Sequence, residues 1–341
     1  MAKNSKIGLW ALLPLLLLSS CGKKNTYVGV YAYDLSDTFI NSLQNKIIKD
    51  LDPYYEHGEY AEDAMSSQTL QNSQLINDID SHRICAAVVN TVDRLAASAL
   101  IEKAEKNNIP LVFINREPLK EDLQKNAWSV ANCFYVGGNP NAEGLAQAEI
   151  ANSLFGGQSS FALSAFDKNK DGKIQVAIVK GEKGHQDAEA RTSSCIDGLS
   201  ASGYNFEIVE SVYCNWKRSE AYTAAKTFSS KNIELLFANN DAMALGVIQA
   251  LQESDASSGV PLSDFKNRHY PIIGCDGTIE GKAAVSYGYM TGTVLNDDTT
   301  QAALVVDVLR KTIDNISIPA YDSNVTFKDN YYYVAGPKIT Q

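Results

Sequence analysis

The chain has 341 residues and a formal net charge of −10 at neutral pH. This acidic balance argues against a nucleic-acid partner, because phosphate binding needs a basic face. Without the N-terminal segment described next, about 320 residues remain, which is too many for one core and typical of two domains.

The N-terminus is typical of an exported protein. Two lysines precede a run of twelve apolar residues, 7–18, which is too short to span a bilayer. Cys21 then follows two serines, as in a bacterial lipobox, where the cysteine is lipidated and becomes the new N-terminus. We therefore predict a signal peptide at 1–20, a lipidated Cys21 and linker at 21–25, and a lipid anchor on a membrane facing the bacterial periplasm. The alternative is an ordinary signal peptide with a chance cysteine.

The rest of the chain alternates short apolar, β-branched runs with helical patterns. Strands are expected at 27–33, 84–90, 110–115 and 133–138, and in a second series at 174–181, 206–213, 234–240, 270–276 and 289–296. Helix-length segments lie between them, for example 94–107, 141–155 and 242–254. A further strand is expected within 54–66, although apolar alternation is weak there. Such alternation predicts an α/β protein with two Rossmann-like lobes, whose parallel sheets are covered on both faces.

Thiol chemistry is not predicted. The five cysteines after Cys21 are scattered and lack the C-x-x-C spacing of redox and metal sites: Cys85, Cys133, Cys195, Cys214 and Cys275. The sequence alone does not decide whether two of these five form a disulfide.

Polar and aromatic side chains follow most of the expected strands. In chain order they are Asp37, Phe39, Asn115, His185, Asp187, Arg191, Trp216, Asn240, Asp276 and Asn296. Ligands of open α/β sheets bind beyond the carboxyl ends of the strands, so these side chains are expected to surround one site. A single Asn or Asp after a strand is more often a turn residue or helix cap, and a single aromatic residue more often belongs to the core. The prediction therefore depends on the coincidence of nearly all strand ends.

This set of side chains suits a neutral ligand with many hydroxyl groups. Each sugar hydroxyl is both donor and acceptor, so carboxylates accept from it while Asn and Arg donate to it. Phe39 and Trp216 offer flat apolar surfaces to the C–H faces of a pyranose ring. Phosphate-cradling G-x-G-x-x-G spacing, a G-x-S-x-G nucleophile elbow and a zinc-ligand cluster do not occur in the sequence.

Three stretches make the sequence similar to the periplasmic galactose/glucose-binding proteins: "KGEKGHQDAEAR" (180–191), "ELLFANNDAMALG" (234–246) and "GTVLNDDTTQA" (292–302). "FDKNKDGKIQ" (166–175) and "VFINREP" (112–118) belong to the same pattern. The resemblance implies a type I periplasmic binding protein: two lobes, a three-stranded hinge and an interlobe sugar site. It also implies a monomeric receptor that delivers D-glucose or D-galactose to an ABC-type permease and, in some members, to a chemotaxis receptor. The expected N-terminal lobe comprises 26–136 and 297–322, and the C-terminal lobe 137–296 and 323–341.

Individual roles follow from the same resemblance. It assigns sugar hydroxyls and the ring oxygen to Asn115, His185, Asp187, Arg191, Asn240, Asp276 and Asn296. Trp216 is expected to cover one face of the ring and Phe39 the other. Asp37 is expected to accept from the hydroxyl at which glucose and galactose differ, with Asp34 as its rival. Lys183 and Gln186 stand where the family commonly has prolines.

A truncated calcium loop lies within "FDKNKDGKIQ". Numbered as an EF-hand loop, it supplies Asp167, Asn169, Asp171, the Lys173 carbonyl and Gln175, but Ile178 replaces the closing Glu. Without flanking helices the segment also fits a solvated turn. The family resemblance supplies the missing ligand, Glu234 at the start of a neighbouring strand. The expectation is a structural Ca²⁺ site with these six ligands.

Two other functional classes compete with a sugar receptor. A sugar-acting enzyme could use Asp37, Asp187 or Asp276 as acid and base. We expect the surrounding Arg and Asn to keep these carboxylates ionised, which suits binding better than acid catalysis. A receptor of the same fold for a pentose or a furanose-type signal is the second alternative. A sugar-responsive repressor shares the fold but would need a helix-turn-helix segment.

Overall fold

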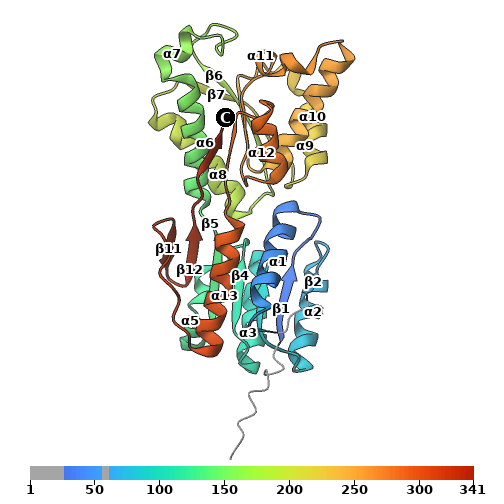
Figure 1. The fold of residues 1–341 in the computed structure, drawn as a ribbon, viewed down its shortest axis with the longest axis vertical. Coiled ribbons are helices and arrows are strands. Elements are labelled where there is room, and N and C mark those ends of the chain that lie inside the picture. Colours follow the sequence, from blue (N-terminus) through green and yellow to red (C-terminus); the bar gives the residue numbers. More distant parts are fainter. Residues whose placement is uncertain (1–26, 56–60) are drawn as a thin grey trace, which may run out of the picture.

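The computed structural model describes residues 27–55 and 61–341, which form two α/β lobes stacked along the long axis of the molecule (Figure 1). The expected signal peptide at 1–20 and the residues 21–25, including Cys21, lie outside the described residues. Lipidation and export therefore stay predictions. Among the described helices, none combines the length and the apolar character that crossing a bilayer requires.

The N-terminal lobe is built on a seven-stranded sheet in the order β11-β12-β5-β4-β3-β1-β2. Its strands are β1 (Tyr27–Ala32), β2 (Ala61–Asp63), β3 (Ile84–Val89), β4 (Leu111–Ile114), β5 (Cys133–Gly138), β11 (Val325–Lys328) and β12 (Tyr331–Val334). Neighbouring strands run parallel except for β11 and β12. The central strands are apolar throughout because helices cover both faces of the sheet.

The helices of this lobe form two layers. One face of the sheet packs on α1 (Thr38–Leu51) and α13 (Asp298–Asp314), and the other on α2 (Gln68–Asp80) and α3 (Ala97–Asn107). Two short helices, α4 (Lys120–Leu123) and α5 (Ala127–Asn132), and a 3₁₀ turn at Arg94–Ala96 complete the lobe. In α1, the buried residues Ile40, Leu43 and Ile47 recur at helical spacing and form the stripe that faces the sheet.

The C-terminal lobe repeats this plan on a six-stranded sheet in the order β13-β10-β9-β8-β6-β7. Its strands are β6 (Ile174–Lys180), β7 (Phe206–Tyr213), β8 (Leu235–Ala238), β9 (Ile272–Ile273), β10 (Gly292–Val294) and β13 (Lys338–Thr340). One face packs on α6 (Pro140–Phe155), α7 (Gln158–Leu163) and α8 (Gln186–Ala201), and the other on α9 (Arg218–Ala225), α10 (Asp241–Ser257), α11 (Phe265–Arg268) and α12 (Ile279–Ser286). Two 3₁₀ turns lie at Phe228–Ser230 and Leu262–Asp264.

The chain passes between the lobes three times: after β5, after β10 and after β12. At the first crossing, a side chain at Gly138 would force Glu143 or Asn296 to move, because a Cβ there would lie 2.6 Å from Glu143 Oε1 and 2.7 Å from Asn296 Oδ1. These crossings form the expected three-stranded hinge. The expected fold, two Rossmann-like lobes, is confirmed.

One expected lobe boundary is wrong. Residues 323–341 were assigned to the C-terminal lobe, but β12 pairs in parallel with β5, and β11 pairs with β12. The apolar run "YYYV" of β12 therefore extends the N-terminal sheet, and only β13 returns to the C-terminal lobe. The strand expected within 54–66 is present as the three-residue edge strand β2, whose residues are only partly buried.

Candidate functional site

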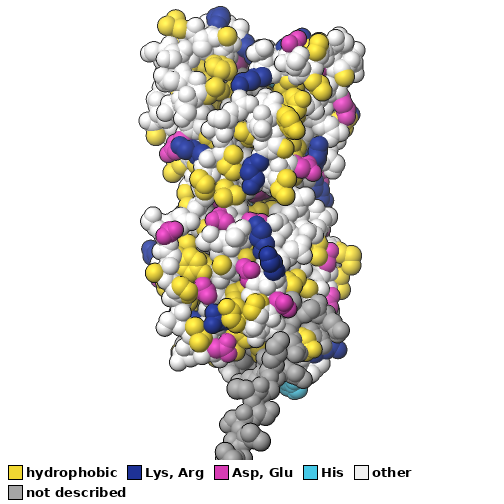
Figure 2. Space-filling model, viewed as in Figure 1, with side chains coloured by type: hydrophobic (Ala, Val, Ile, Leu, Met, Phe, Trp, Pro, Cys, Tyr) yellow, Lys and Arg dark blue, Asp and Glu magenta, His cyan; other side chains and the backbone are white. Residues whose placement is uncertain are grey.

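A cleft of about 1310 Å³ opens between the lobes, at the carboxyl ends of the parallel strands. Figure 2 shows acidic and basic side chains near the waist where the lobes meet. A smaller inner pocket shares six lining residues with this cleft. The inner pocket is lined by Tyr33, Asp37, Phe39, Asn115, His185, Asp187, Arg191, Trp216, Asn240, Asp276 and Asn296. The structure therefore brings all ten candidate residues together, with Tyr33 as an addition.

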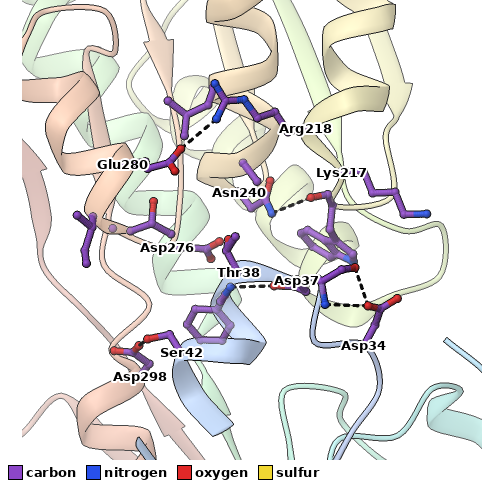
Figure 3. Close-up of a pocket in the computed structure, with 18 of the residues that line it drawn as sticks. Asp34, Asp37, Thr38, Ser42, Lys217, Arg218, Asn240, Asp276, Glu280 and Asp298 are labelled. Carbon is purple, nitrogen blue, oxygen red and sulfur yellow. Dashed lines mark hydrogen bonds and ion pairs between the residues drawn. The ribbon is translucent and has the colours of Figure 1, made fainter. Parts of the chain in front are cut away.

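On the N-terminal side, Asp37 caps helix α1. Its Oδ1 accepts from the backbone N–H groups of Phe39 (2.9 Å) and Ile40 (3.2 Å), and its Oδ2 accepts from the Tyr33 hydroxyl at 2.8 Å. Asp37 thus serves both as a helix cap and as a pocket-lining group. Figure 3 places Asp37 and Thr38 on one side of the cleft, with Asn240 and Asp276 opposite.

The rival carboxylate, Asp34, occupies a different place. It lines only the outer cleft, where it accepts from the backbone N–H and hydroxyl of Ser36 and from the hydroxyl of Ser66. These bonds hold Asp34 in a partly exposed turn. Of the two carboxylates, Asp37 is the one that reaches the inner pocket.

Asn115 ends β4 in the left-handed conformation, with φ of 58°. Its side-chain Oδ1 accepts from Asn90 Nδ2 at 3.2 Å, and its carbonyl accepts from the Tyr135 hydroxyl at 3.0 Å. Asparagine adopts this backbone conformation more readily than most residues. The turn places the Asn115 carbonyl where Gln186 Nε2 of the C-terminal lobe donates to it.

Opposite Asn115, the segment after β6 carries His185, the N-cap of helix α8, and Asp187 in the first turn of that helix. The Nδ1 of His185 accepts from the backbone N–H of Asp187 at 3.1 Å, which caps helix α8. Burial lowers the pKa of His185 well below its usual value, and the positive charges of Arg116 and Arg191 lower it further. His185 is therefore neutral, and with Nδ1 accepting, its proton lies on Nε2, which can donate.

Trp216 occupies a strained turn with φ of 64°. Its indole fits against the backbone of Gly181, where an added Cβ would lie 2.3 Å from the ring. The His185 ring meets the indole edge-on, with 5.0 Å between ring centroids. The indole Nε1 is buried and has no hydrogen-bond partner among the described residues. Such an unpaired donor is costly unless a ligand satisfies it.

Arg191 lies at the centre of the charged groups, with 2% of its surface exposed. Its Nε donates to Glu143 Oε2 at 2.6 Å and its Nη1 to the Asn239 carbonyl at 2.7 Å. A longer ion pair joins Nη1 to Asp276 Oδ1 at 3.5 Å. Glu143 and Asp276 hold the guanidinium fork in one orientation beside the pocket.

Two further amides line the pocket from other strand ends. Asn240 caps α10 by accepting from the backbone N–H of Met243 at 2.9 Å, and its Nδ2 donates to the Trp216 carbonyl at 3.3 Å. Asn296 Oδ1 accepts from Gln301 Nε2 at 2.6 Å. This bond connects Asn296 with Gln301, in the first turn of α13, at the second hinge crossing.

The prediction that the pocket keeps its carboxylates ionised is wrong, because the pKa values of these groups are raised rather than lowered. Burial raises the pKa of Asp187 to about 7, and it raises the pKa of Asp276 well above its ordinary value although Arg191 opposes the rise. Burial also raises the pKa of Asp37. Loss of hydration outweighs the neighbouring positive charge, because these groups lie between two lobes rather than in an open turn.

Sequence reasoning missed Tyr33 and Arg116. Tyr33 follows β1 directly, and Arg116 follows Asn115, so the rule of strand ends could have found both. A tyrosine in the apolar segment "YAY" reads as a core residue, and its hydroxyl bond to Asp37 becomes visible only in the structure.

At the truncated calcium loop, Glu234 reaches the loop as expected. Its backbone N–H donates to the Gln175 carbonyl, next to the pairing of β6 with β8. Its carboxylate accepts from the backbone N–H groups of Lys168, Asn169 and Gln175. Asp167 Oδ1 and Gln175 Oε1 are buried without a hydrogen-bond partner among the described residues. Asp171 accepts from the side-chain amides of Asn169 and Gln175.

Metal and thiol chemistry find no other support in the structure. Within 27–55 and 61–341, no three or more His, Cys, Asp or Glu side chains gather closely enough to hold a metal ion. This holds for the three carboxylates of the candidate calcium loop as well, Asp167, Asp171 and Glu234. Cys133, Cys195, Cys214 and Cys275 are free thiols, and all four are buried.

Comparison with known proteins identifies the family. A family model described as a periplasmic binding protein domain matches residues 28–316. The chain belongs to the periplasmic binding protein family. The D-galactose/methyl-galactoside binding periplasmic protein MglB of Haemophilus influenzae is 32% identical over 285 residues, covering 82% of this chain and 80% of that protein. A xylitol-binding protein of Mycolicibacterium smegmatis is 26% identical over 332 residues, covering 92% and 82%.

Solved structures of periplasmic binding proteins share the fold. A Caulobacter myo-inositol binding protein with bound myo-inositol superposes with a TM-score of 0.70 at 18% identity, covering 93% of this chain and 94% of that one. A solute binding protein from Actinobacillus succinogenes with bound D-allose also has a TM-score of 0.70, at 20% identity, covering 92% and 97%. At these identities the likeness concerns the two-lobed architecture alone.

Proposed function

We propose that this periplasmic binding protein holds one monosaccharide, D-glucose or D-galactose, between its lobes and delivers it unchanged to an ABC-type permease. The observation that carries the proposal is the convergence of ten candidate residues, from both lobes, on one pocket. Carboxylates, amides, a guanidinium and a neutral imidazole there complement hydroxyl groups, and Trp216 and Phe39 offer apolar faces from opposite lobes. The similarity to a D-galactose/methyl-galactoside binding protein supports the choice of hexose.

A non-catalytic role fits the way the carboxylates are held. Asp37 accepts three hydrogen bonds from its own lobe, and Asp276 faces the fixed guanidinium of Arg191. These contacts hold the two carboxylates in place to accept from the hydroxyl groups of a ligand. Recovery of unchanged sugar after long incubation with the protein supports this role, whereas a chemically altered sugar contradicts it.

A receptor for another polyol is the second candidate. According to their descriptions, two relatives in sequence bind xylitol and D-allose, and a solved structure of the same fold holds myo-inositol. Titration calorimetry of the mature protein against D-glucose, D-galactose, D-allose, D-ribose, xylitol and myo-inositol separates the candidates. We expect the tightest binding with D-glucose or D-galactose. Heat with another member of the panel, and none with these two hexoses, overturns the proposed specificity.

The affinity should depend on pH through Asp187. Its pKa of about 7 in the folded protein exceeds its ordinary value of 3.8, so its contribution to folding stability is present at low pH and is lost as the pH rises through 7. The ionised carboxylate is a stronger acceptor for sugar hydroxyls than the protonated acid, whose charge-assisted hydrogen bonds are lost. We therefore expect sugar to bind about tenfold more weakly at pH 6 than at pH 8, by linkage to one proton. Calorimetry at both pH values should show a smaller change in affinity for Asp187→Asn than for the wild type. An equal change in that variant contradicts the role of Asp187 in the pH dependence.

We further propose that Asp167, Asn169, Asp171, the Lys173 carbonyl, Gln175 and Glu234 hold one structural Ca²⁺. Two features support this assignment: the unpaired buried oxygens of Asp167 and Gln175, and the carboxylate of Glu234 beside the loop. Oxygen donors of this kind suit a hard cation. A bound ion would tie the loop to β8 within a single lobe, away from the interlobe pocket.

Chelation should therefore lower stability and leave sugar specificity intact. With calcium in large excess over its dissociation constant, its removal is expected to lower the melting temperature by about 5–10 °C. Scanning calorimetry with and without EGTA measures this shift, and Asp167→Asn should lose the response to EGTA. Melting unaffected by EGTA contradicts the calcium site. Loss of sugar binding in chelated but folded protein contradicts its purely structural role.

A further inference from the structure

Two contacts join the lobes beside the inner pocket, and both connect the segment after β4 with the stretch from the loop after β6 to the first residue of α8. Arg116 Nη2 pairs with Glu182 Oε2 at 2.6 Å, and Gln186 Nε2 donates to the Asn115 carbonyl at 2.6 Å. We call these two contacts the interlobe clasp. Because Asn115 and Arg116 belong to the N-terminal lobe while Glu182 and Gln186 belong to the C-terminal lobe, the clasp exists only when the lobes are close together.

Arg116 is buried, with 5% of its surface exposed, although its partner Glu182 is half-exposed. Within its own lobe the guanidinium donates from Nη1 to the Val92 carbonyl at 2.7 Å. Its Nε has no hydrogen-bond partner among the described residues. When the lobes separate, Arg116 loses the only carboxylate that pairs with it within hydrogen-bond distance in the described part of the chain. Because Arg116 is buried in the closed arrangement, water screens its pair with Glu182 less than it screens a surface pair, so the ion pair favours closure.

The same guanidinium also contacts the pocket. It lies over the ring of Tyr33, 4.2 Å from the centroid, and the Tyr33 hydroxyl donates to Asp37 Oδ2 at 2.8 Å. A continuous chain of contacts thus runs from Glu182 in one lobe through Arg116 and Tyr33 to Asp37 in the other. The positive charge of Arg116 also opposes the rise that burial causes in the pKa of Asp37.

We propose that Arg116 is a positioning residue of the sugar site: held by Glu182 when the lobes close, it aligns Tyr33 and thereby Asp37 with the bound ligand. This inference rests on the proposed sugar-binding function, since it assigns a role within that site. The clasp stabilises the closed arrangement even without a ligand. It therefore increases the fraction of closed protein that is available to bind sugar.

The test compares Glu182→Gln with a matched control, Glu280→Gln. Glu280 also pairs with an arginine, Arg218, at 3.0 Å, but both residues belong to the C-terminal lobe, so their contact does not depend on closure. We expect Glu182→Gln to weaken sugar binding about tenfold, since it removes the charge from an interlobe pair. Glu280→Gln should bind within twofold of the wild type. Titration calorimetry with D-glucose and D-galactose gives both values.

Variants at Arg116 separate positioning from a general loss of stability. Arg116→Lys keeps the charge and should bind within a fewfold of the wild type, whereas Arg116→Gln should lose at least as much affinity as Glu182→Gln. The double variant Glu182→Gln/Arg116→Gln should be no weaker than Arg116→Gln alone, because the two residues act through one contact. Additive losses in the double variant contradict the coupling.

X-ray scattering of the sugar-free proteins provides a readout that needs no ligand. Glu182→Gln should show a larger radius of gyration than the wild type and than Glu280→Gln. If the wild type binds no monosaccharide, the proposed function fails, and the scattering comparison still tests the clasp. An affinity within twofold of the wild type, together with unchanged scattering, overturns the inference.

Discussion

Replacing Arg191 by Gln should weaken sugar binding by about 200-fold to 5,000-fold. The guanidinium is buried and donates to Glu143, to the Asn239 carbonyl and towards Asp276. Its loss removes a cationic group that lines the pocket and leaves buried carboxylates without a counter-charge, which typically costs about 3–5 kcal/mol. Titration calorimetry on the purified variant measures the loss of affinity, and circular dichroism verifies that the variant is folded.

Arg191→Lys is the control for charge alone. Lysine preserves the positive charge but lacks the planar fork that contacts three groups at once, so it should restore stability better than affinity. A folded Arg191→Gln variant that binds D-glucose or D-galactose within tenfold of the wild type contradicts the central place of Arg191 in the site.

Trp216→Ala should cost about a hundredfold to a thousandfold in affinity for a pyranose and much less in stability. The indole is only partly buried, packs on Gly181 and meets His185 edge-on, so its removal opens the pocket wall rather than the core of the lobe. Loss of a large aromatic surface accounts for this magnitude. Calorimetry measures the affinity and thermal melting the stability.

Trp216→Phe retains a flat apolar face but loses the indole N–H, so its affinity should lie between those of the wild type and Trp216→Ala. If Trp216→Ala binds the sugar as tightly as the wild type, the ligand does not use this face, and the pose proposed for the pyranose ring is wrong.

Most of the site could be predicted from one rule, that ligands of open α/β sheets bind beyond the carboxyl ends of the strands. In a parallel sheet the carboxyl ends of all strands meet at one edge, so residues as distant as Asp37 and Asn296 could be placed together without a structure. Strand positions were predictable for the same reason: central strands such as β3 and β6 are apolar throughout because both faces are covered.

Long-range pairing could not be predicted in the same way. The sequence "YYYV" in β12 indicates a strand but does not say which sheet it joins, and pairing with β5 connects residues almost two hundred positions apart. The interlobe contacts have the same character. In the sequence, Arg116 and Glu182 look like any other charged residues. Their pairing depends on the relative position in which the hinge holds the two lobes.

The ionisation of the pocket was mispredicted for a physical reason. Neighbouring Arg and Asn residues are visible in a sequence, whereas the loss of water around Asp187 and Asp276 follows from the closeness of the two lobes. Composition therefore indicated the charges that surround these carboxylates but not the burial that raises their pKa values.

A crystal structure of the mature protein grown with D-glucose tests the central claim most directly. The account predicts one pyranose in the inner pocket, with Trp216 and Phe39 on its two faces and Arg191, Asp187 and Asp276 within hydrogen-bond distance of its oxygens. A sugar bound elsewhere on the chain, or an inner pocket that excludes glucose and galactose while the protein is folded, contradicts it.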